Sequence, residues 1–344
     1  MHWSSKSSTV SALRDRLLAA AAVLMFGGFA GPRVHAQQDP QAGAQDPQAG
    51  AQAPQAISET TGAAFKSDVT TMNSVPLLGP KEDPALHIDF APAVWAARVR
   101  ADSALGGPTF SVDGDLGLNG YEAAFNGELA ISWDEFWRVQ LTGWTFSTDA
   151  SITSTVSGAF GSVNIAVGDR LSNSFAAASA GGEFSATLWR PFSTRQFPWG
   201  GNTPQPGNIA SDGRPIVDFG IQAIGAVRWY SASMTVNDLT AGTSASWSLG
   251  AVMPGIGGGI EFDFNMVDRV SWLRSVRFEA AGGTGSNFTN GQYFIFARAG
   301  LRAMFTEQIG GEFGYRLEDF NLSSNGASFD GGVQGLYVGI DVRF

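Results

Sequence analysis

The 344-residue sequence contains no cysteine, only three histidines, and no uninterrupted apolar run of bilayer length. The absence of cysteine excludes a disulfide scaffold, a thiolate metal site, a cysteine nucleophile and a lipid-anchored cysteine. The longest apolar run, residues 17–30, is shorter than the roughly 20 residues that a membrane-spanning helix needs, which argues against a helical membrane protein. The net charge of −10 argues against binding to a nucleic-acid backbone.

Lysine is also scarce. Beyond residue 36 the chain has 17 basic and 30 acidic residues, and all of these cations except Lys66 and Lys81 are arginine. The guanidinium group forms fixed, bidentate ion pairs better than the lysine ammonium group does. We therefore expect arginines in ordered pairs with carboxylates.

Residues 1–36 have the pattern of a secretory signal peptide. Basic residues precede the apolar run, and Val34, His35 and Ala36 form a small-x-small cleavage site. An uncleaved membrane anchor is the alternative. Residues 37–84 follow as a predicted disordered tail and lead-in, because the repeat QDPQAGA at 38–44 and 45–51 offers too little apolar surface to fold. We interpret the tail as a spacer, with binding to peptidoglycan or a partner as the alternative.

Within the last twelve residues, 333–344, two kinds of side chain alternate from Gly335 onward. One face carries Leu336, Val338, Ile340, Val342 and Phe344, and the other carries Gly335, Tyr337, Gly339, Asp341 and Arg343. Such a strand has one apolar and one polar face. The positions Tyr337, Gly339, Val342 and Phe344 resemble the C-terminal assembly signal of bacterial outer-membrane β-barrel proteins. The resemblance implies insertion in the cell outer membrane by the barrel-assembly machinery.

Nine earlier segments repeat this alternation. They are 86–100, 121–133, 136–146, 175–190, 218–230, 256–265, 274–283, 293–305 and 309–318. We predict an all-β chain that forms an up-and-down antiparallel transmembrane β-barrel of ten strands over residues 85–344, with eight to twelve strands possible. A phase change near Pro92 predicts a bulge, and further hairpins in 148–174 or 191–217 would make twelve strands.

An even number of strands places both ends of the barrel on one side. The connections expected on the opposite side are long, namely 101–120, 148–174, 231–255, 284–292 and 319–332. Long loops in such barrels face outward, and short turns face the periplasm. A secreted β-sandwich is the soluble alternative.

The polar faces of the later strands carry a ladder of charges, which we expect to line the lumen. Its members are Glu261, Asp263, Arg277, Glu279, Arg298, Arg302, Glu312, Arg316, Glu318, Asp341 and Arg343. Matching parity across a short turn lets Arg302 and Glu312 face each other. We favour a salt-bridged filling of a narrow lumen over an ion or solute path.

Catalysis is not expected. The only histidine after the signal peptide, His87, begins the first strand, and the long loops contain none. Outer-membrane barrel hydrolases use a histidine with serine or aspartate, so a barrel hydrolase is only an alternative. The carboxylate pairs Asp113 with Asp115 and Asp319 with Asp330 are expected to be solvated or to bridge divalent cations to lipopolysaccharide. No catalytic, cofactor or metal site is predicted.

The sequence therefore predicts a monomeric, non-enzymatic outer-membrane protein with a structural or surface-interaction role and a salt-bridged lumen. A narrow passive channel for small solutes is the nearest alternative. The expected partners are outer-membrane lipid, lipopolysaccharide and the assembly machinery, with no nucleic acid. Interfacial aromatic belts are expected at Trp133, Trp137, Trp229, Tyr230 and Trp272. The segment Asp115 to Leu118, reading DLGL, resembles a motif of uncharacterised barrel proteins.

Overall fold

The computed structural model describes residues 86–133, 136–193, 207–288 and 291–344. The predicted signal peptide and repeat tail lie outside these residues. The chain divides into two compact units, and all described residues belong to the second, Pro80–Phe344. No helix of the described residues is long and apolar enough to cross a membrane.

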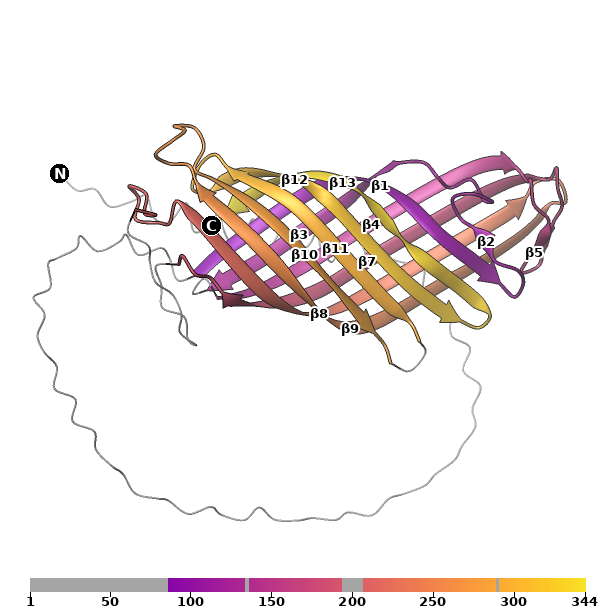
Figure 1. Cartoon of the computed structure of the whole chain (residues 1–344). Coiled ribbons are helices and arrows are strands. Elements are labelled where there is room, and N and C mark those ends of the chain that lie inside the picture. Colours follow the sequence, from indigo (N-terminus) through magenta and orange to yellow (C-terminus); the bar gives the residue numbers. More distant parts are fainter. Residues whose placement is uncertain (1–85, 134–135, 194–206, 289–290) are drawn as a thin grey trace, which may run out of the picture. The chain divides into compact units, whose positions relative to one another are not determined.

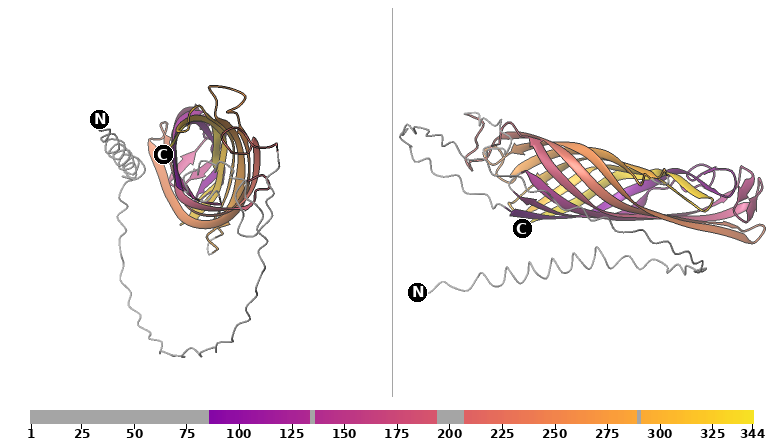
Figure 2. Two further views of the ribbon diagram at one scale, coloured as in Figure 1. Left: turned by 90° about the vertical axis from the view of Figure 1, so that its left-hand side faces the viewer. Right: turned by 90° about the horizontal axis from the view of Figure 1, so that it is seen from below.

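Ten long antiparallel strands close into a single ring (Figure 1). They are β1 (Leu86–Leu105), β3 (Glu122–Trp133), β4 (Trp137–Thr153), β7 (Arg170–Trp189), β8 (Val217–Asp238), β9 (Thr243–Asn265), β10 (Ser275–Ser286), β11 (Tyr293–Met304), β12 (Ile309–Ser324) and β13 (Ala327–Arg343). Each strand pairs with its neighbours along the chain, and β13 pairs with β1 to close the ring. The prediction of an all-β, ten-strand, up-and-down barrel is confirmed, and Figure 2 shows the ring along and across its axis.

Three short strands lie outside the ring. β2 (Phe110–Ser111) pairs with β1, while β5 (Gly158–Phe160) and β6 (Val163–Ile165) form a separate hairpin. The stretch 148–174 therefore does contain an extra hairpin, but this hairpin adds no strand to the barrel. In the described part of 191–217 only an isolated bridge, Ile209 to Pro215, is found. The ring thus has ten strands and not twelve.

Several strands are longer than the sequence pattern predicted. β8 and β9 contain 22 and 23 residues and meet at a turn over 239–242. The prediction of a long loop over 231–255 is therefore wrong, and the loop expected over 319–332 is also largely strand, because β12 ends at Ser324 and β13 begins at Ala327. Of the loop expected over 284–292, only 284–286 belong to a strand. The reason is that alternation continues beyond residue 230 with its polarity reversed, so the outward residues become small hydroxyl side chains. A search for outward apolar residues misses such a strand.

The prediction of a bulge near Pro92 is also wrong. β1 pairs with β3 in one unbroken register through Phe90 with Leu129, Pro92 with Gly127 and Val94 with Phe125. The register shift of the ring lies instead between Thr187 and Trp189 on β7.

An exposed apolar band surrounds the ring near the end where Leu86 and Phe344 lie, which we call the terminal end. On β1 its last outward member is Ala96, and Arg98 follows. The band ends in the same way between Trp229 and Ser231 on β8. On β12 its last outward member is Leu317, which Asp319 follows. On β13 its last outward member is Leu336, and Gln334 is the next outward residue toward the far end. The outward face thus changes from apolar to polar at one level of the barrel.

The height of this band matches a bilayer. Residues 86–96 of β1 extend over about 33 Å along the strand at a rise of about 3.3 Å per residue. With the tilt of about 40° that such barrels have, this length corresponds to about 25 Å along the axis, the height of the apolar band in outer-membrane barrels. The strands continue past the band toward the opposite, far end.

Candidate functional site: the barrel lumen

Among the described residues, eight arginines and ten carboxylates line the lumen at the level of the apolar band. The arginines are Arg138, Arg190, Arg228, Arg277, Arg298, Arg302, Arg316 and Arg343, and the carboxylates are Asp89, Glu128, Glu183, Asp218, Glu261, Asp263, Glu279, Glu312, Glu318 and Asp341. All eleven residues of the expected ladder lie on this inner face. Seven further members were not included in it, although the same alternation on the first five ring strands could have identified them.

One part of this charged layer is centred on Arg228. Its guanidinium group forms ion pairs with Glu183 and, at 2.7 Å, with Glu318. Arg298 binds Glu183 at 2.9 Å and Glu279 at 3.2 Å. The strands β8 and β12, like β7 and β11, are separated in the ring by three others. The pairs Arg228–Glu318 and Arg298–Glu183 therefore cross the lumen, while the other two pairs join neighbouring strands.

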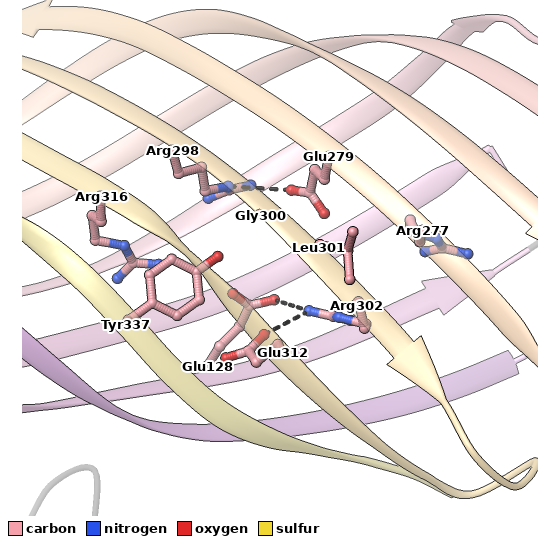
Figure 3. Close-up of a pocket in the computed structure, with 10 residues that line it drawn as sticks. All are labelled: Glu128, Arg277, Glu279, Arg298, Gly300, Leu301, Arg302, Glu312, Arg316 and Tyr337. Atoms are coloured by element: carbon pink, nitrogen blue, oxygen red, sulfur yellow. Dashed lines mark hydrogen bonds and ion pairs between the residues drawn. The ribbon is translucent and has the colours of Figure 1, made fainter. Parts of the chain in front are cut away.

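A second part is centred on Arg302, close to the first (Figure 3). The Arg302 guanidinium group lies 3.3 Å from Asp341, 3.4 Å from Glu312 and 3.7 Å from Glu128. Arg302 and Glu312 are directly opposite on neighbouring strands, the placement that their parity indicates. Arg138 also binds Glu128, at 2.6 Å. The cavity among these side chains is about 20 Å³, room for about one water molecule.

Further pairs lie nearer the terminal end. Arg343 binds Asp89 at 2.8 Å, and Arg277 binds Asp263 at 2.6 Å. Arg190, which follows β7, pairs with Glu261 and with Asp218 at 3.3 Å. Seven of these eight arginines thus have a carboxylate partner within 4.0 Å. Arg316 instead donates a hydrogen bond to Asn126 and lies 5.8 Å from the ring centre of Tyr337.

The four positions of the expected assembly signal divide between the two faces of β13. Val342 and Phe344 lie on the outward face, while Tyr337 points into the lumen across Gly300 and Gly314. A Cβ atom at Gly314 would lie 2.6 Å from the Tyr337 hydroxyl, so glycine is needed beneath this ring. Recognition of these residues by the assembly machinery stays a prediction.

Above the charged layer the lumen is filled by aromatic rings. Phe329 on β13 stacks on Phe175 of β7 with ring centres 5.1 Å apart and contacts Trp247 of β9 at 6.2 Å. Phe320 lies 4.8 Å from Tyr230. β7 and β9 are each three strands removed from β13, so these contacts cross the lumen. The far half of the barrel therefore has a packed apolar core.

The β1–β3 connection and the β5–β6 hairpin form a plug over this core. Its buried side chains are Phe110, Val112, Leu116, Leu118, Phe160 and Val163. Asn173 donates a hydrogen bond to the Leu116 carbonyl, and the Gly161 amide donates to the Leu105 carbonyl. Gly117 has a φ of +71°, a conformation that favours glycine and lets both flanking leucines enter the barrel. The DLGL segment is thus part of the plug, a role that its sequence did not indicate.

The acidic pairs considered for catalysis have other environments. Asp113 accepts a hydrogen bond from the Ser111 hydroxyl and Asp115 from the Ser111 amide, so both stabilise one turn. Asp319 and Asp330 lie on the outward face of neighbouring strands. The described residues contain no cluster of three or more histidine, cysteine or acidic side chains that could hold a metal ion.

The connections at the terminal end are themselves tied together. Asp212 accepts hydrogen bonds from Arg214 and from the Asn265 side chain, and Ser211 donates to Asp268. Although burial opposes ionisation, these hydrogen bonds and the Arg214 charge hold the pKa of Asp212 below its ordinary value.

An aromatic belt follows the terminal edge of the apolar band. Trp137 stacks on Phe184 with ring centres 5.5 Å apart, and Trp272 stacks on Phe305 at 6.2 Å. At the opposite edge Trp229 faces outward, as expected for an interfacial residue. The prediction that Tyr230 belongs to this belt is wrong, because Tyr230 is fully buried in the lumen and donates a hydrogen bond to Glu318 at 2.6 Å.

No protein-family model and no curated protein matches the sequence. Among solved structures, the outer membrane protease OmpT from Escherichia coli is 10% identical, with 77% of this chain and 98% of that chain covered and a TM-score of 0.35. Ail, the attachment invasion locus protein of Yersinia pestis, is 10% identical over 75% and 99%, with a TM-score of 0.31. The Pseudomonas putida toluene transporter TodX is 8% identical over 76% and 91%, with a TM-score of 0.24. These outer-membrane barrels differ in activity, and likeness at this level assigns none to the present chain.

Proposed function

We propose that this chain is a sealed outer-membrane β-barrel with a structural or surface-interaction role, which conducts no solute and catalyses no reaction. The contact between Phe175 and Phe329 carries this proposal, because it joins opposite walls in the middle of the lumen. A passive channel would need a continuous aqueous path past this core. The cross-lumen ion pairs of the charged layer support the same conclusion.

In this proposal the apolar band lies in the bilayer and the terminal end lies in the periplasm. A band about 25 Å high with all of its charge inside suits lipid on the outside. The far half then projects from the cell surface, where its outward Ser and Thr side chains face water. We also propose that the barrel-assembly machinery inserts this chain into the membrane and that the ring is monomeric.

The absence of enzymatic activity is supported by the lumen chemistry. Its carboxylates are paired with arginine, which removes them as general bases, and His87 lies at the terminal end opposite Ser132. The cavity near Arg302 has room for about one water molecule and none for a substrate.

Conductance in a planar bilayer tests the seal. We expect neither the wild type nor the Arg302→Ala, Glu312→Ala double variant to conduct, since the aromatic core is intact in both. Heat-modifiable gel mobility of the same reconstituted samples confirms that the barrels are folded. Steady current steps from the wild type would overturn the proposal, and steps from the double variant alone would place the seal in the charged layer.

The lack of cysteine allows a direct test of orientation. In Ser246→Cys the thiol lies in the far half, and in Glu307→Cys it lies in a turn of the terminal end. A membrane-impermeant maleimide added to intact cells should label the first variant and not the second. Labelling of the second alone would reverse the orientation.

A further inference from the structure

Two arginines, Arg98 and Arg100, face outward on β1 directly above the apolar band, whose last member there is Ala96. Among the described outward positions of the ten ring strands, a third arginine occurs at Arg170, near the far end of β7, and lysine is absent. Two of the three cationic side chains on the outward face of the ring strands thus lie at one level of one strand. That level is where lipid headgroups would contact the barrel.

The neighbouring strands place no charged residue directly opposite these two arginines. β3 ends at Glu122, which pairs with Ala97, so both arginines extend beyond it. On the other side, β13 places Gln334 opposite Arg98 and Gly332 opposite Arg100. Neither of these neighbours carries a charge, and Gly332 has no side chain.

Arg98 is held in place without being neutralised. Its guanidinium carbon lies 5.1 Å from the ring centre of Tyr121, a cation–π contact that restricts the side chain. Its Nε atom is buried and has no hydrogen-bond partner among the described residues. No ion pair with a described carboxylate forms within 4.0 Å of it. The group is therefore oriented and has free donors.

The nearby carboxylates lie mainly on the water side of this pair. Asp113 is 4.0 Å from Arg100, whose side chain is 62% exposed, so this contact is a weak one. Asp102 follows on β1, one outward position farther from the band, and is opposite Asp330 of β13. Glu122 is exposed at the end of β3 opposite Ala97, so it lies beside Arg98 and not on the water side. An anion that approaches from the bilayer side therefore meets the arginines before Asp102 and Asp113.

We propose that Arg98 and Arg100 form a binding site for a phosphate group on the headgroup of an outer-leaflet glycolipid. The inference rests on the proposed function, because it needs the apolar band to lie in the membrane. Guanidinium groups bind phosphate with paired N–H donors, and a phosphate attached to a lipid is confined to the level of this site. Arg170, well above the band, lies outside the reach of such a headgroup.

The test measures glycolipid binding to the full chain refolded in detergent. Lipid A with phosphates at both ends of its disaccharide is the probe, monophosphoryl lipid A and phosphatidylglycerol are the comparisons, and native mass spectrometry counts bound lipid. The double variant Arg98→Gln, Arg100→Gln should bind the probe about tenfold to hundredfold more weakly than the wild type, the loss expected for hydrogen bonds to a charged group. The matched variant Arg170→Gln should bind like the wild type.

Equal binding by the double variant and the wild type would overturn the site. Equal loss in Arg170→Gln would mean that only net charge matters, and preference for phosphatidylglycerol would overturn the choice of glycolipid. Insertion into vesicles, followed by protease protection, separates this inference from the proposed function. If the protein inserts but the lipid preference is missing, only the site fails. If it does not insert, the proposed function fails.

Discussion

The two halves of the barrel share most of their strands but have opposite polarity. In the half nearer the terminal end, the outward face is apolar and the lumen holds arginines and carboxylates. In the far half the outward residues are mostly small hydroxyl side chains, such as Ser231 and Ser248, and the lumen holds aromatic rings such as Phe329. The reversal occurs within single strands and without a break in the ring.

This comparison shows that the surroundings of each half determine what its lumen must contain. Apolar outward residues suit lipid, and the charges enclosed behind them are satisfied by cross-lumen pairs. The far half follows the rule of soluble proteins, with its apolar side chains inside and its polar ones in water. The strand β13 contains both arrangements, with Ser328, Asp330 and Gln334 outward in one half and Leu336 to Phe344 in the other.

The largest effect should come from breaking the charged layer. Arg228→Met removes the cation between Glu183 and Glu318 and leaves two buried carboxylates without it. We expect a loss of about 3–5 kcal/mol in the free energy of unfolding, the usual cost of breaking a buried ion pair. Urea unfolding in detergent, followed by tryptophan fluorescence, measures this loss.

Arg170→Met is the control, since the same substitution at an exposed position should cost little. Adding Glu318→Gln to Arg228→Met should restore part of the stability, because Glu318 is left without a cation whereas Glu183 keeps Arg298. A double variant no more stable than Arg228→Met would contradict this account.

A smaller effect is expected from adding a charge to the outward face of β13. Ile340→Arg places a cation in the middle of the apolar band and should cost about 2–4 kcal/mol of stability in the membrane. Ser328→Arg places the same side chain on the same face of the same strand, but in the far half, and should cost about zero. The free energy of folding into vesicles gives both values. Equal costs at the two sites would mean that the halves do not differ in their surroundings.

The ten strands could be predicted because each contains at least five residues of strict alternation with apolar residues outward. The continuation of β8 and β9 could not, since Ser231, Ser233 and Ser248 alternate with inward Ala232, Met234 and Leu249 in the opposite sense. Loops also contain polar residues next to small apolar ones. The sequence pattern alone therefore does not distinguish a strand with polar outward residues from a loop.

The charged layer was only partly predictable. Arg302 and Glu312 face each other on neighbouring strands, so their parity and the short turn between them were sufficient. The partners across the lumen, such as Arg228 with Glu318, lie 90 residues apart, and no local pattern relates them. The plug was missed for the same reason, because Leu116 and Leu118 are buried by strands distant in sequence.

The smallest effect, and the one that isolates the plug, is expected at a single glycine. Gly117→Ala adds a Cβ atom 2.4 Å from Ile152 Cγ2 at a φ of +71° and should displace the DLGL turn from the far half. Gly168→Ala has a comparable positive φ of +98° with nothing within 4 Å of the new atom, so it shows the backbone strain alone. Gly117→Ala should therefore cost more stability than Gly168→Ala by about 1 kcal/mol or more, as expected for overpacking. Urea unfolding measures the difference, and limited proteolysis should cut residues 106–121 faster in Gly117→Ala only. Equal stability and equal cleavage of the two variants would mean that the far half does not depend on a tightly packed plug.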